Sequence, residues 1–417
     1  MNSLVLKRRV VVTGYGAVTP LGMTSAENWS AIMGYRVGYR YHDWSDMGIR
    51  ARFFGLIDEE PNLKKVPAAI RRRLPRFARL VISAAQEAMA MAFQQGSPAD
   101  YYDSLECGTI IGSGWAGQDE THINYEDYLR TKLGSPFGCI LSMPNAATAA
   151  CSLNWGLRGY QNTPIAACAT GTIAIGDAFE AIRSGRASMM LAGGGESLRT
   201  SAAVWNIDVL GALTSEQSEL SKACCPFSLD RNGFVLSEGA AVLCLEEREA
   251  AISRGAAILG EIKGYGAYSD AFDFTAPAED KIARVKTIQR ALAQAELKPE
   301  QIDYINAHGT STLLNDLNET ESIKQALGDA AWNMPISSTK SYSGHLIAAA
   351  GSFESIICLQ VLQHQIMPAT HHLNNADPQC DLDYIRGEHR PGKLRNTLNL
   401  SFGFGGANAA LVIGMSD

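Results

Sequence analysis

The chain has 417 residues, of which 46% are hydrophobic and 19% charged, and its formal net charge is −7. This composition is typical of a globular protein with ample material for a core, in one large domain or two. The negative charge argues against nucleic-acid binding by the whole surface, and no segment is apolar for long enough to span a bilayer.

The N-terminus and the cysteines indicate the compartment. Lys7, Arg8 and Arg9 follow the few apolar residues of the N-terminus instead of preceding them, which is atypical of a signal peptide. The nine cysteines form no Cys-x-x-Cys pair and no cluster with histidines at metal-binding spacing. We therefore expect a cytoplasmic protein with reduced thiols and no zinc.

The first expected strand covers residues 10–13 and runs into Gly14-Tyr-Gly-Ala17. A Gly-x-Gly after a strand suggests a dinucleotide site, but the third glycine is missing and Thr19-Pro20 stands where the helix would begin. The chain has no P-loop either. We therefore reject a nucleotide-binding enzyme.

A basic segment follows at residues 64–79, with seven cations and no acid. It is either a solvated helix face or a docking patch for an acidic partner. Apolar spacing predicts a helix over residues 74–93, with Pro75 in its first turn. A strand is expected at residues 107–111, before a glycine-rich loop in which Trp115 either packs or forms the wall of a pocket.

Residues 164–182 predict a short buried strand, a turn of small residues and then a helix whose first turn begins beside Cys168. A thiol there is close to the positive end of the helix dipole and to free backbone N–H groups, which favours the thiolate near neutral pH. Ala167, Ala169 and Gly171 leave room for a substrate. The alternative is that Cys168 is only a small buried hydrophobic side chain, as most free cysteines are.

Several short patterns occur twice, in the same order. Gly14-Tyr-Gly-Ala17 recurs as Gly264-Tyr-Gly-Ala267, and a Pro-Ile pair precedes a helix at Pro164 and again at Pro335. These repeats indicate a duplicated α/β unit with a boundary near Arg254-Gly255, so that the halves are residues 1–254 and 255–417. The further matches are Ile173-Ala174, Phe179-Glu180 and Ile182 with Ile347-Ala348, Phe353-Glu354 and Ile356, all 174 residues apart, and the glycine-rich turns Gly193-Gly-Gly195 and Gly403-Phe-Gly-Gly406.

Two similar halves of this kind are expected to pack with their strand ends at one cleft. This arrangement would place three loops of the second half opposite Cys168: one with His308, one with Lys340 and His345, and one around Phe404. Both histidines stand among Gly, Ser and Thr, where a ligand can approach. The other histidines have no such setting and are expected to be structural or on the surface: His42, His122, His364, His371, His372 and His389.

Four segments, in order, resemble the signatures of the β-ketoacyl-acyl-carrier-protein synthases of the KAS I/II type. They are Ala167-Cys-Ala-Thr-Gly171, Asn306-Ala-His-Gly-Thr-Ser-Thr312, Ser338-Thr-Lys-Ser341 with Gly344-His345, and Asn399-Leu-Ser-Phe-Gly-Phe-Gly-Gly406. The similarity covers nearly the whole chain. It implies an α/β fold of the thiolase type, a duplicated αβαβα layered fold with two similar halves, in agreement with the internal repeat.

The resemblance also implies a role for each matched residue. Cys168 would take the growing acyl chain from the phosphopantetheine arm of an acyl carrier protein as a thioester. His308 and His345 would assist decarboxylation of malonyl-carrier protein and hold the enolate whose carbanion attacks the acyl-cysteine. The other implied residues are Lys340 and Glu354 as a supporting pair, Asp316 and Glu319 behind the histidines, Thr310 and Thr312 on the pantetheine amides, and Phe404 as a gate and, with Cys168, an oxyanion-hole N–H donor.

The implied reaction is chain elongation by decarboxylative Claisen condensation, because thiolases and chain-initiating synthases give their cysteine other partners. No metal or redox cofactor is expected, since loss of carbon dioxide drives the condensation. The implied partners are an acyl carrier protein and a second subunit, identical or resembling a chain-length factor. The alternative is an inactive scaffold or chain-length subunit. The family docks carriers through basic residues, which makes candidates of Arg72, Arg73, Arg76 and Arg79.

Three positions depart from the family pattern. Trp115 stands where long-chain synthases have a smaller aliphatic residue in the acyl pocket, so its ring would restrict or reshape the chain; alternatively, it packs at a dimer interface. Gly211 replaces an arginine, and Leu313-Leu-Asn315 replaces Pro-x-Gly. These departures favour a dedicated type II polyketide or polyene pathway, with an inactive homologue as partner, over housekeeping fatty acid elongation.

Overall fold

The computed structural model describes residues 8–417. The expectation that the N-terminus is not a signal peptide depends in part on residues 1–7, which lie outside this range. None of the helices in the described range has the length and apolar character needed to cross a membrane. The strands of the main sheet are β1 (Val10–Val18), β4 (Cys107–Gly112), β5 (Gln161–Asn162), β6 (Met189–Glu196), β8 (Gly239–Glu247), β9 (Gly260–Ser269), β10 (Tyr304–Asn306), β11 (Ile336–Ser337), β14 (Asn396–Phe402) and β15 (Ala407–Gly414).

Two small sheets lie beside the main one. They contain β2 (Arg40–Tyr41), β3 (Phe53–Gly55) and β7 (Leu236–Ser237), and β12 (Ile366–Met367) and β13 (Arg390–Pro391). The α-helices are α1 (Ser25–Met33), α2 (Ala68–Arg71), α3 (Arg76–Ala92), α4 (Gln118–Thr131), α5 (Gly138–Ser142), α6 (Ala146–Trp155), α7 (Thr170–Arg183), α8 (Ser201–Asp208), α9 (Leu220–Ala223), α10 (Arg248–Ser253), α11 (Ile282–Ala295), α12 (Leu313–Leu327), α13 (Lys340–Ser343) and α14 (Ala350–His364).

The strand order shows the duplication directly. The main sheet runs β11-β10-β14-β15-β9-β1-β8-β6-β4-β5, and β1 pairs antiparallel with β9 in the middle. Counted outward from that seam, each half places its strands in the same chain order: first, fifth, fourth, second, third. The predicted duplicated α/β fold is therefore confirmed.

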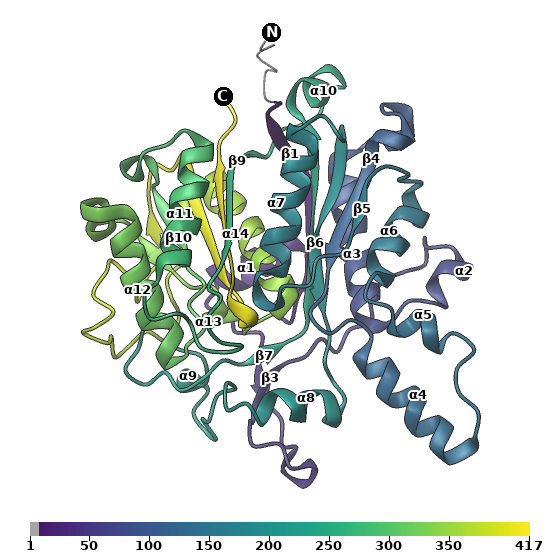
Figure 1. The fold of residues 1–417 in the computed structure, drawn as a ribbon, viewed down its shortest axis with the longest axis horizontal. Helices are drawn as coiled ribbons and strands as arrows, with labels where there is room; N and C mark the ends of the chain where they lie inside the picture. Colours follow the sequence, from purple (N-terminus) through teal and green to yellow (C-terminus); the bar gives the residue numbers. More distant parts are fainter. Residues whose placement is uncertain (1–7) are drawn as a thin grey trace.

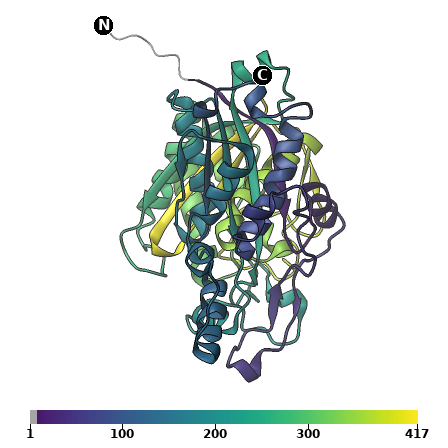
Figure 2. The same cartoon turned by 90° about the vertical axis from the view of Figure 1, so that its right-hand side faces the viewer.

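The helices form layers around these strands (Figure 1). α7 and α14 pack against each other in the middle of the molecule, between the strands of the two halves. α3 covers β1 and β8 from outside, and α11 covers β9 and β15. α4 projects from the body, at the bottom of Figures 1 and 2. This layering brings the N-terminal ends of α7 and α14 together at the centre.

The paired Gly-x-Gly segments lie inside strands β1 and β9, where they let helices approach closely. A Cβ on Gly14 or Gly16 would lie 2.1 Å from a carbonyl oxygen of α3, and a Cβ on Gly264 or Gly266 would lie 2.1 Å from one of α11. The repeat thus has the same packing cause in both halves. It explains why neither segment is a phosphate-binding turn.

Three local expectations were wrong. Gly193-Gly-Gly195 is not a turn but part of β6, where a Cβ on Gly194 would lie 2.2 Å from the carbonyl oxygen of Ala348. The segment before Cys168 is not a buried strand, because β5 ends at Asn162 and Ile165 is 57% exposed. Pro75 precedes α3 as its N-cap instead of lying in its first turn.

The two central helices correspond at a spacing of 180 residues, not 174. A single-turn 3-10 helix precedes each of them, and the first residue of that turn, Ala167 or Ile347, has a positive φ of 47° or 51°. Gly171 and Gly351 then occupy equivalent places, each packed against the other helix. The matched letters of the sequence therefore lie six residues out of structural register.

Candidate active site

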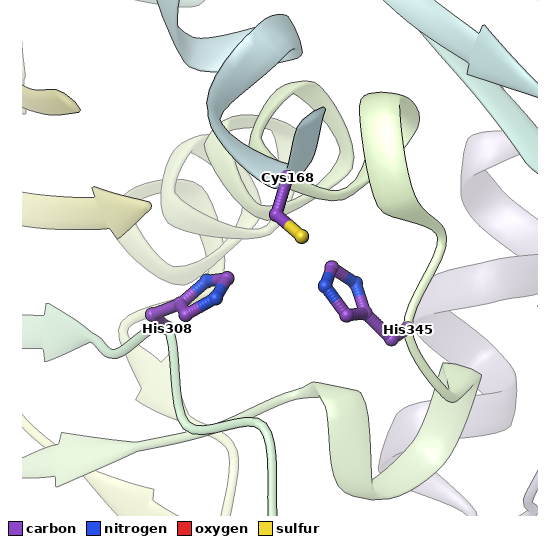
Figure 3. A group of neighbouring side chains, drawn as sticks. All are labelled: Cys168, His308 and His345. Carbon is purple, nitrogen blue, oxygen red and sulfur yellow. The ribbon is translucent and has the colours of Figure 1, made fainter. Parts of the chain in front are cut away.

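Cys168 lies in the 3-10 turn Ala167–Ala169, directly before α7, and is 5% exposed. The positive φ of Ala167 is uncommon for a residue with a side chain, and such backbone strain concentrates at functional sites. It turns the chain sharply, so that the sulfur points away from α7 toward the second half. Figure 3 shows the sulfur facing the space between two imidazole rings.

Those rings belong to His308 and His345, the two histidines singled out by the sequence. His308 follows β10, and His345 follows α13. One donor atom from each of Cys168, His308 and His345 can be chosen so that all three lie within 4.8 Å of one another. The ring centroids are 5.5 Å apart and the rings nearly perpendicular, at 82°. The predicted convergence of the sulfur and two imidazoles is confirmed.

Hydrogen bonds define the tautomer of each imidazole. The backbone N–H of Ile347 donates to Nδ1 of His345 over 3.2 Å, and the Lys340 ammonium lies 3.3 Å from Nδ1 of His308. Since both Nδ1 atoms face donors, the proton of each neutral ring belongs on Nε2. Nε2 of His345 is buried and has no partner among the described residues. Both rings therefore present N–H donors to a substrate.

Lys340 and Glu354 form the pair implied by the sequence. The ammonium donates to Oε1 of Glu354 over 2.5 Å and to the carbonyl oxygen of His308 over 2.6 Å. Both side chains are almost fully buried. Burial raises the pKa of Glu354 to about 7, against the opposing effect of Lys340. Lys340 thus holds the backbone and the ring of His308 at the same time.

Two more buried acids hold the loop after β10. Glu319 accepts from the backbone N–H groups of His308 and Gly309 over 2.7 and 2.8 Å, and Asp316 accepts from the N–H of Thr310 over 3.1 Å. Burial raises the pKa of Glu319 to about 7. These carboxyl groups do not reach the reacting atoms; they position the loop that carries His308.

Burial controls the protonation of the three central groups. It lowers the pKa of His308 and His345 well below the usual value, and Lys340 adds to the effect. It raises the pKa of Cys168 to about 11, although Lys340 and the N–H groups of Phe404 and Cys168 act in the opposite direction. The expected thiolate near neutral pH is therefore wrong for the resting site, because the loss of water outweighs the stabilising donors.

The glycine-rich turn after β14 closes over the sulfur. A Cβ on Gly403 would lie 3.2 Å from the backbone nitrogen of Cys168 and 2.7 Å from the carbonyl oxygen of Ala166, so only glycine fits. This close approach brings the N–H of Phe404 next to the N–H of Cys168 around the sulfur. Two such donors side by side can stabilise negative charge on an oxygen.

A cavity of about 300 Å³ leads to these groups, and Thr310, Thr312 and Phe404 line it. The two threonine hydroxyls are 2.9 Å apart. Trp115 does not line this cavity: it packs in an apolar cluster that also includes Ile347 and Phe404. The N–H groups of residues 114 and 115 donate to the buried Glu196 and so anchor the loop that carries this ring.

The spacing of Cys168, His308 and His345 is also close enough to consider a metal ion. A metal would need an unprotonated nitrogen from each ring. If Nε2 lost its proton to Nδ1, that proton would face the N–H of Ile347 or the ammonium of Lys340. The donor set therefore fits a hydrogen-bond-accepting oxygen better than a cation.

The predicted docking arginines fall into two groups. Arg72 and Arg79 line a surface groove with Lys64 and Arg71, and Arg73 lies 5.5 Å from the ring of Phe137. Arg76 turns inward: its Nε donates to the fully buried carboxylate of Glu238 over 2.8 Å, and its Nη1 donates to Glu60. Arg76 is therefore already engaged within the protein, and its assignment to docking stays a prediction.

One residue in the cavity escaped the sequence analysis. Arg284 of α11 is 5% exposed and lines the cavity together with Cys168 and His308. The available signal was an arginine on the apolar face of a helix, four residues before the buried Ile288. No short motif contains it, which is why it was missed.

The layered duplicated fold and the buried cysteine with two histidines define a thiolase-like condensing enzyme. The sequence matches the models "Beta-ketoacyl synthase, N-terminal domain" over residues 7–251 and "Beta-ketoacyl synthase, C-terminal domain" over residues 259–374. The chain belongs to the β-ketoacyl synthase family. A 3-oxoacyl-[acyl-carrier-protein] synthase 2 of Synechocystis is 38% identical over 412 residues, 97% of each chain.

Solved structures give the same result. A chain of the AntDE:AntF complex, described as a type II polyketide acyl-carrier protein with its ketosynthase bound to the hexaketide, superposes with a TM-score of 0.90 at 31% identity, over 98% of this chain and 100% of its own. The ishigamide ketosynthase/chain length factor gives a TM-score of 0.88 at 28% identity, over 99% and 100%.

Proposed function

We propose that this chain is an elongating β-ketoacyl-acyl-carrier-protein synthase, an acyltransferase that condenses a malonyl-carrier protein with an enzyme-bound acyl thioester. The observation that carries the proposal is the convergence of one sulfur and one ring nitrogen from each of two imidazoles within 4.8 Å. The chain also resembles chain-length subunits in fold, but it retains the cysteine, both histidines and Lys340. The active enzyme is therefore favoured over an inactive scaffold.

In the first half-reaction, the sulfur of Cys168 attacks the acyl thioester on the pantetheine arm. The backbone N–H groups of Cys168 and Phe404 stabilise the oxyanion of the tetrahedral intermediate. The carbon–sulfur bond to pantetheine then breaks, and the thiol proton of Cys168 goes to the departing thiolate. The products are the acyl-enzyme and a free carrier thiol.

In the second half-reaction, malonyl-carrier protein enters the same cavity and loses carbon dioxide. The electron pair of the broken carbon–carbon bond moves into the thioester as an enolate, which accepts hydrogen bonds from Nε2–H of His308 and His345. The enolate carbon attacks the acyl-cysteine carbonyl, and the sulfur of Cys168 leaves and recovers a proton. The scheme uses no metal or redox cofactor, because decarboxylation supplies the driving force.

The proposed carrier dock is the groove lined by Lys64, Arg71, Arg72 and Arg79, with Arg73 beside it. Its positive charge suits an acidic carrier protein and would speed encounter. In the AntDE:AntF structure, by its description, a carrier protein is bound to a related ketosynthase. We place the reaction in the cytoplasm, where carrier-dependent synthesis would supply the substrates.

A second subunit, identical or resembling a chain-length factor, completes the proposal. β5 leaves one edge of the main sheet unpaired, and sheet edges of this kind invite pairing. Large apolar side chains of α4, α5, α6 and the segment after β5 are also exposed, as expected of an interface: Tyr125, Tyr128, Leu129, Ile140, Leu153 and Ile165. The proposed boundary of the halves, near residue 254, fits the gap between β8 and β9.

We further propose a dedicated polyketide or polyene pathway, on the basis of Trp115. The ring packs in the same apolar cluster as Phe404, the residue that the resemblance implies is a gate. If the turn that carries Phe404 moves to admit an acyl chain, the ring would occupy space that the chain needs. A bulky ring there would hinder long saturated chains more than short or flat polyenoyl chains.

The test is intact-mass measurement of acyl transfer from a panel of acyl-carrier proteins. We expect short and polyenoyl chains to add one acyl group to the wild type and none to Cys168→Ala, and β-ketoacyl product to require Cys168. Long saturated chains should load only after Trp115→Ala. Undiminished product from Cys168→Ala would contradict the enzyme assignment, whereas equal loading of long chains by the wild type would contradict only the pocket argument.

A further inference from the structure

Of the described residues that line the cavity, Arg284 is the one arginine or lysine. It lies on α11 of the second half, 5% exposed, with Thr312 and Asn315 of the neighbouring segment on the same wall. Its guanidinium lies 4.2 Å from the centroid of the Phe402 ring, and the edge-on ring of His308 packs against the same phenylalanine. Arg284 therefore stands one side chain away from a proposed catalytic histidine.

The guanidinium has few partners for a buried cation. Among residues 8–417, its hydrogen-bond partner is Asn315, whose Oδ1 accepts from Nη1 over 3.1 Å, while Nε is buried with no partner. Within the same residues, no carboxylate oxygen lies within the 4.0 Å of an ion pair with Arg284. Buried charges are normally paired, because an uncompensated one is costly.

The nearby acids do not neutralise Arg284 by contact. Glu319, Asp270 and Asp316 attract it from a distance. The oxygens of Glu319 and Asp316 accept from the backbone of the loop that carries His308. Asp270, which also lines the cavity, accepts from the side chain of Asn408 and the N–H of Ala278. Burial lowers the pKa of Arg284 to about 10, so it stays positively charged at neutral pH. The cavity wall thus holds a cation with unused N–H donors and a planar shape that suits a carboxylate.

We propose that Arg284 binds the carboxylate of the malonyl group while the thioester lies between His308 and His345. This inference rests on the proposed function, which supplies a substrate with an anionic end in this cavity. The phosphate of the pantetheine arm has similar chemistry. The lining residues Leu313 and Leu314 are more than 60% exposed, so they mark the mouth of the cavity, where the phosphate would lie. Arg284 is instead buried in the wall, which favours the carboxylate as its ligand.

The sign of the effect follows from the chemistry. Decarboxylation turns the carboxylate into neutral carbon dioxide, so an arginine contact stabilises the bound substrate more than the transition state. Arg284 therefore lowers KM for the malonyl substrate and does not raise kcat. A residue that only supports the fold would not separate the two constants in this way.

The experiment uses Arg284→Gln, with Lys286→Gln as the matched control, because Lys286 is an exposed cation on the same helix. Steady-state condensation is measured with malonyl-carrier protein and with the malonyl thioester of pantetheine, which lacks the phosphate. We expect KM for both substrates to rise about 10- to 100-fold in Arg284→Gln, with kcat unchanged or higher. The control should match the wild type, and Arg284→Lys should give an intermediate KM.

Acyl loading of Cys168, measured by intact mass on each variant, separates the two proposals. If the wild type neither loads nor condenses, the proposed function fails. If Arg284→Gln loads normally but both KM values stay within about twofold of the wild type, carboxylate binding by Arg284 is overturned. A rise confined to the carrier-borne substrate would also overturn it, since it would identify the phosphate as the anion. If Arg284→Gln does not load an acyl group, the KM values of Arg284→Lys for the two malonyl substrates are judged by the same criteria.

Discussion

The imidazole of His345 shows how a single backbone contact can determine chemistry. The N–H of Ile347 donates to its Nδ1, which leaves the ring proton on Nε2, toward Cys168. Lys340 does the same for His308. Because burial keeps both rings neutral, they are suited to donate hydrogen bonds to the enolate oxygen of the proposed reaction and are not poised to take up a proton from a thiol.

The pKa of Cys168 predicts how its reactivity depends on pH. Only the thiolate reacts with iodoacetamide, and burial raises the pKa of Cys168 to about 11. The alkylation rate should therefore rise about tenfold per pH unit from pH 7 to 10, since the thiolate fraction grows by that factor below the pKa. Peptide mass mapping in a Cys139→Ser background measures the rate without the exposed cysteine.

The unfolded chain is the control for this measurement. In denaturant, the rate for Cys168 should level off just above the ordinary cysteine pKa of about 8.5. A plateau at or below pH 9 in the folded protein would contradict the raised pKa. It would mean that the donors around the sulfur outweigh burial.

Motifs made some residues predictable and left others hidden. Cys168, His308 and His345 could be selected because each stands in a short run of small residues that a ligand can reach. Arg284 belongs to no such run, and its importance depends on Phe402 and Asn315, which are distant in sequence. The ion pair of Arg76 was hidden for the same reason, since its partner Glu238 is 162 residues away.

At the scale of elements, the helix expected over residues 74–93 and the strand expected over 107–111 were located within a few residues, but the strand expected before Cys168 is absent from the described residues and glycines were misjudged. Sequence rules treat glycine as a turn signal, because its backbone is free locally. In β1, β6 and β9 the glycines instead serve contacts between elements, which a local pattern does not contain. The register error between α7 and α14 has a similar origin. The sequence analysis aligned the two helices by identical residues, whereas in the structure the turns before the helices show which residues are equivalent.

These contacts predict the effect of adding one methyl group. Gly16→Ala and Gly266→Ala would each place a Cβ 2.1 Å from a helix carbonyl oxygen, so the backbone must shift. We expect each to lower the free energy of unfolding by about 1–3 kcal/mol. Chemical denaturation followed by circular dichroism measures the change.

Gly34→Ala is the matched control, since Gly34 is exposed at the end of α1 and its Cβ would come no closer than 3.2 Å to other atoms. Its effect should stay within about 0.5 kcal/mol. Losses of the same size in all three variants would show that backbone freedom, and not helix approach, accounts for the glycines.

At the scale of the molecule, the duplication was predictable because two segments of the chain share Gly-Tyr-Gly-Ala, and the strand order bears it out. The sequence predicted the basic patch at residues 64–79, but it did not predict which of its cations form ion pairs within the protein. That depends on buried acids such as Glu238, which the fold brings beneath the patch.

Charge reversal tests the patch. Arg72→Glu with Arg79→Glu should raise KM for carrier-borne substrates about tenfold at low salt and less at high salt, because the attraction is between exposed charges. Kinetics with pantetheine thioesters should be unchanged. Arg290→Glu with Arg386→Glu, two exposed arginines of the second half, is the control. An equal loss with the small thioesters would place the effect in the cavity and not in docking.

The crossing of α7 and α14 has a consequence for how such a molecule can change over time. A Cβ on Gly171 would lie 2.7 Å from the carbonyl oxygen of Ala348, and one on Gly351 would lie 1.9 Å from the hydroxyl of Thr172. The contact that joins the two copies is thus only a few residues from the sulfur and the imidazoles. Neither copy can acquire a larger residue there unless the other yields, so the duplicated segments must evolve as one unit at this point even while their surfaces diverge.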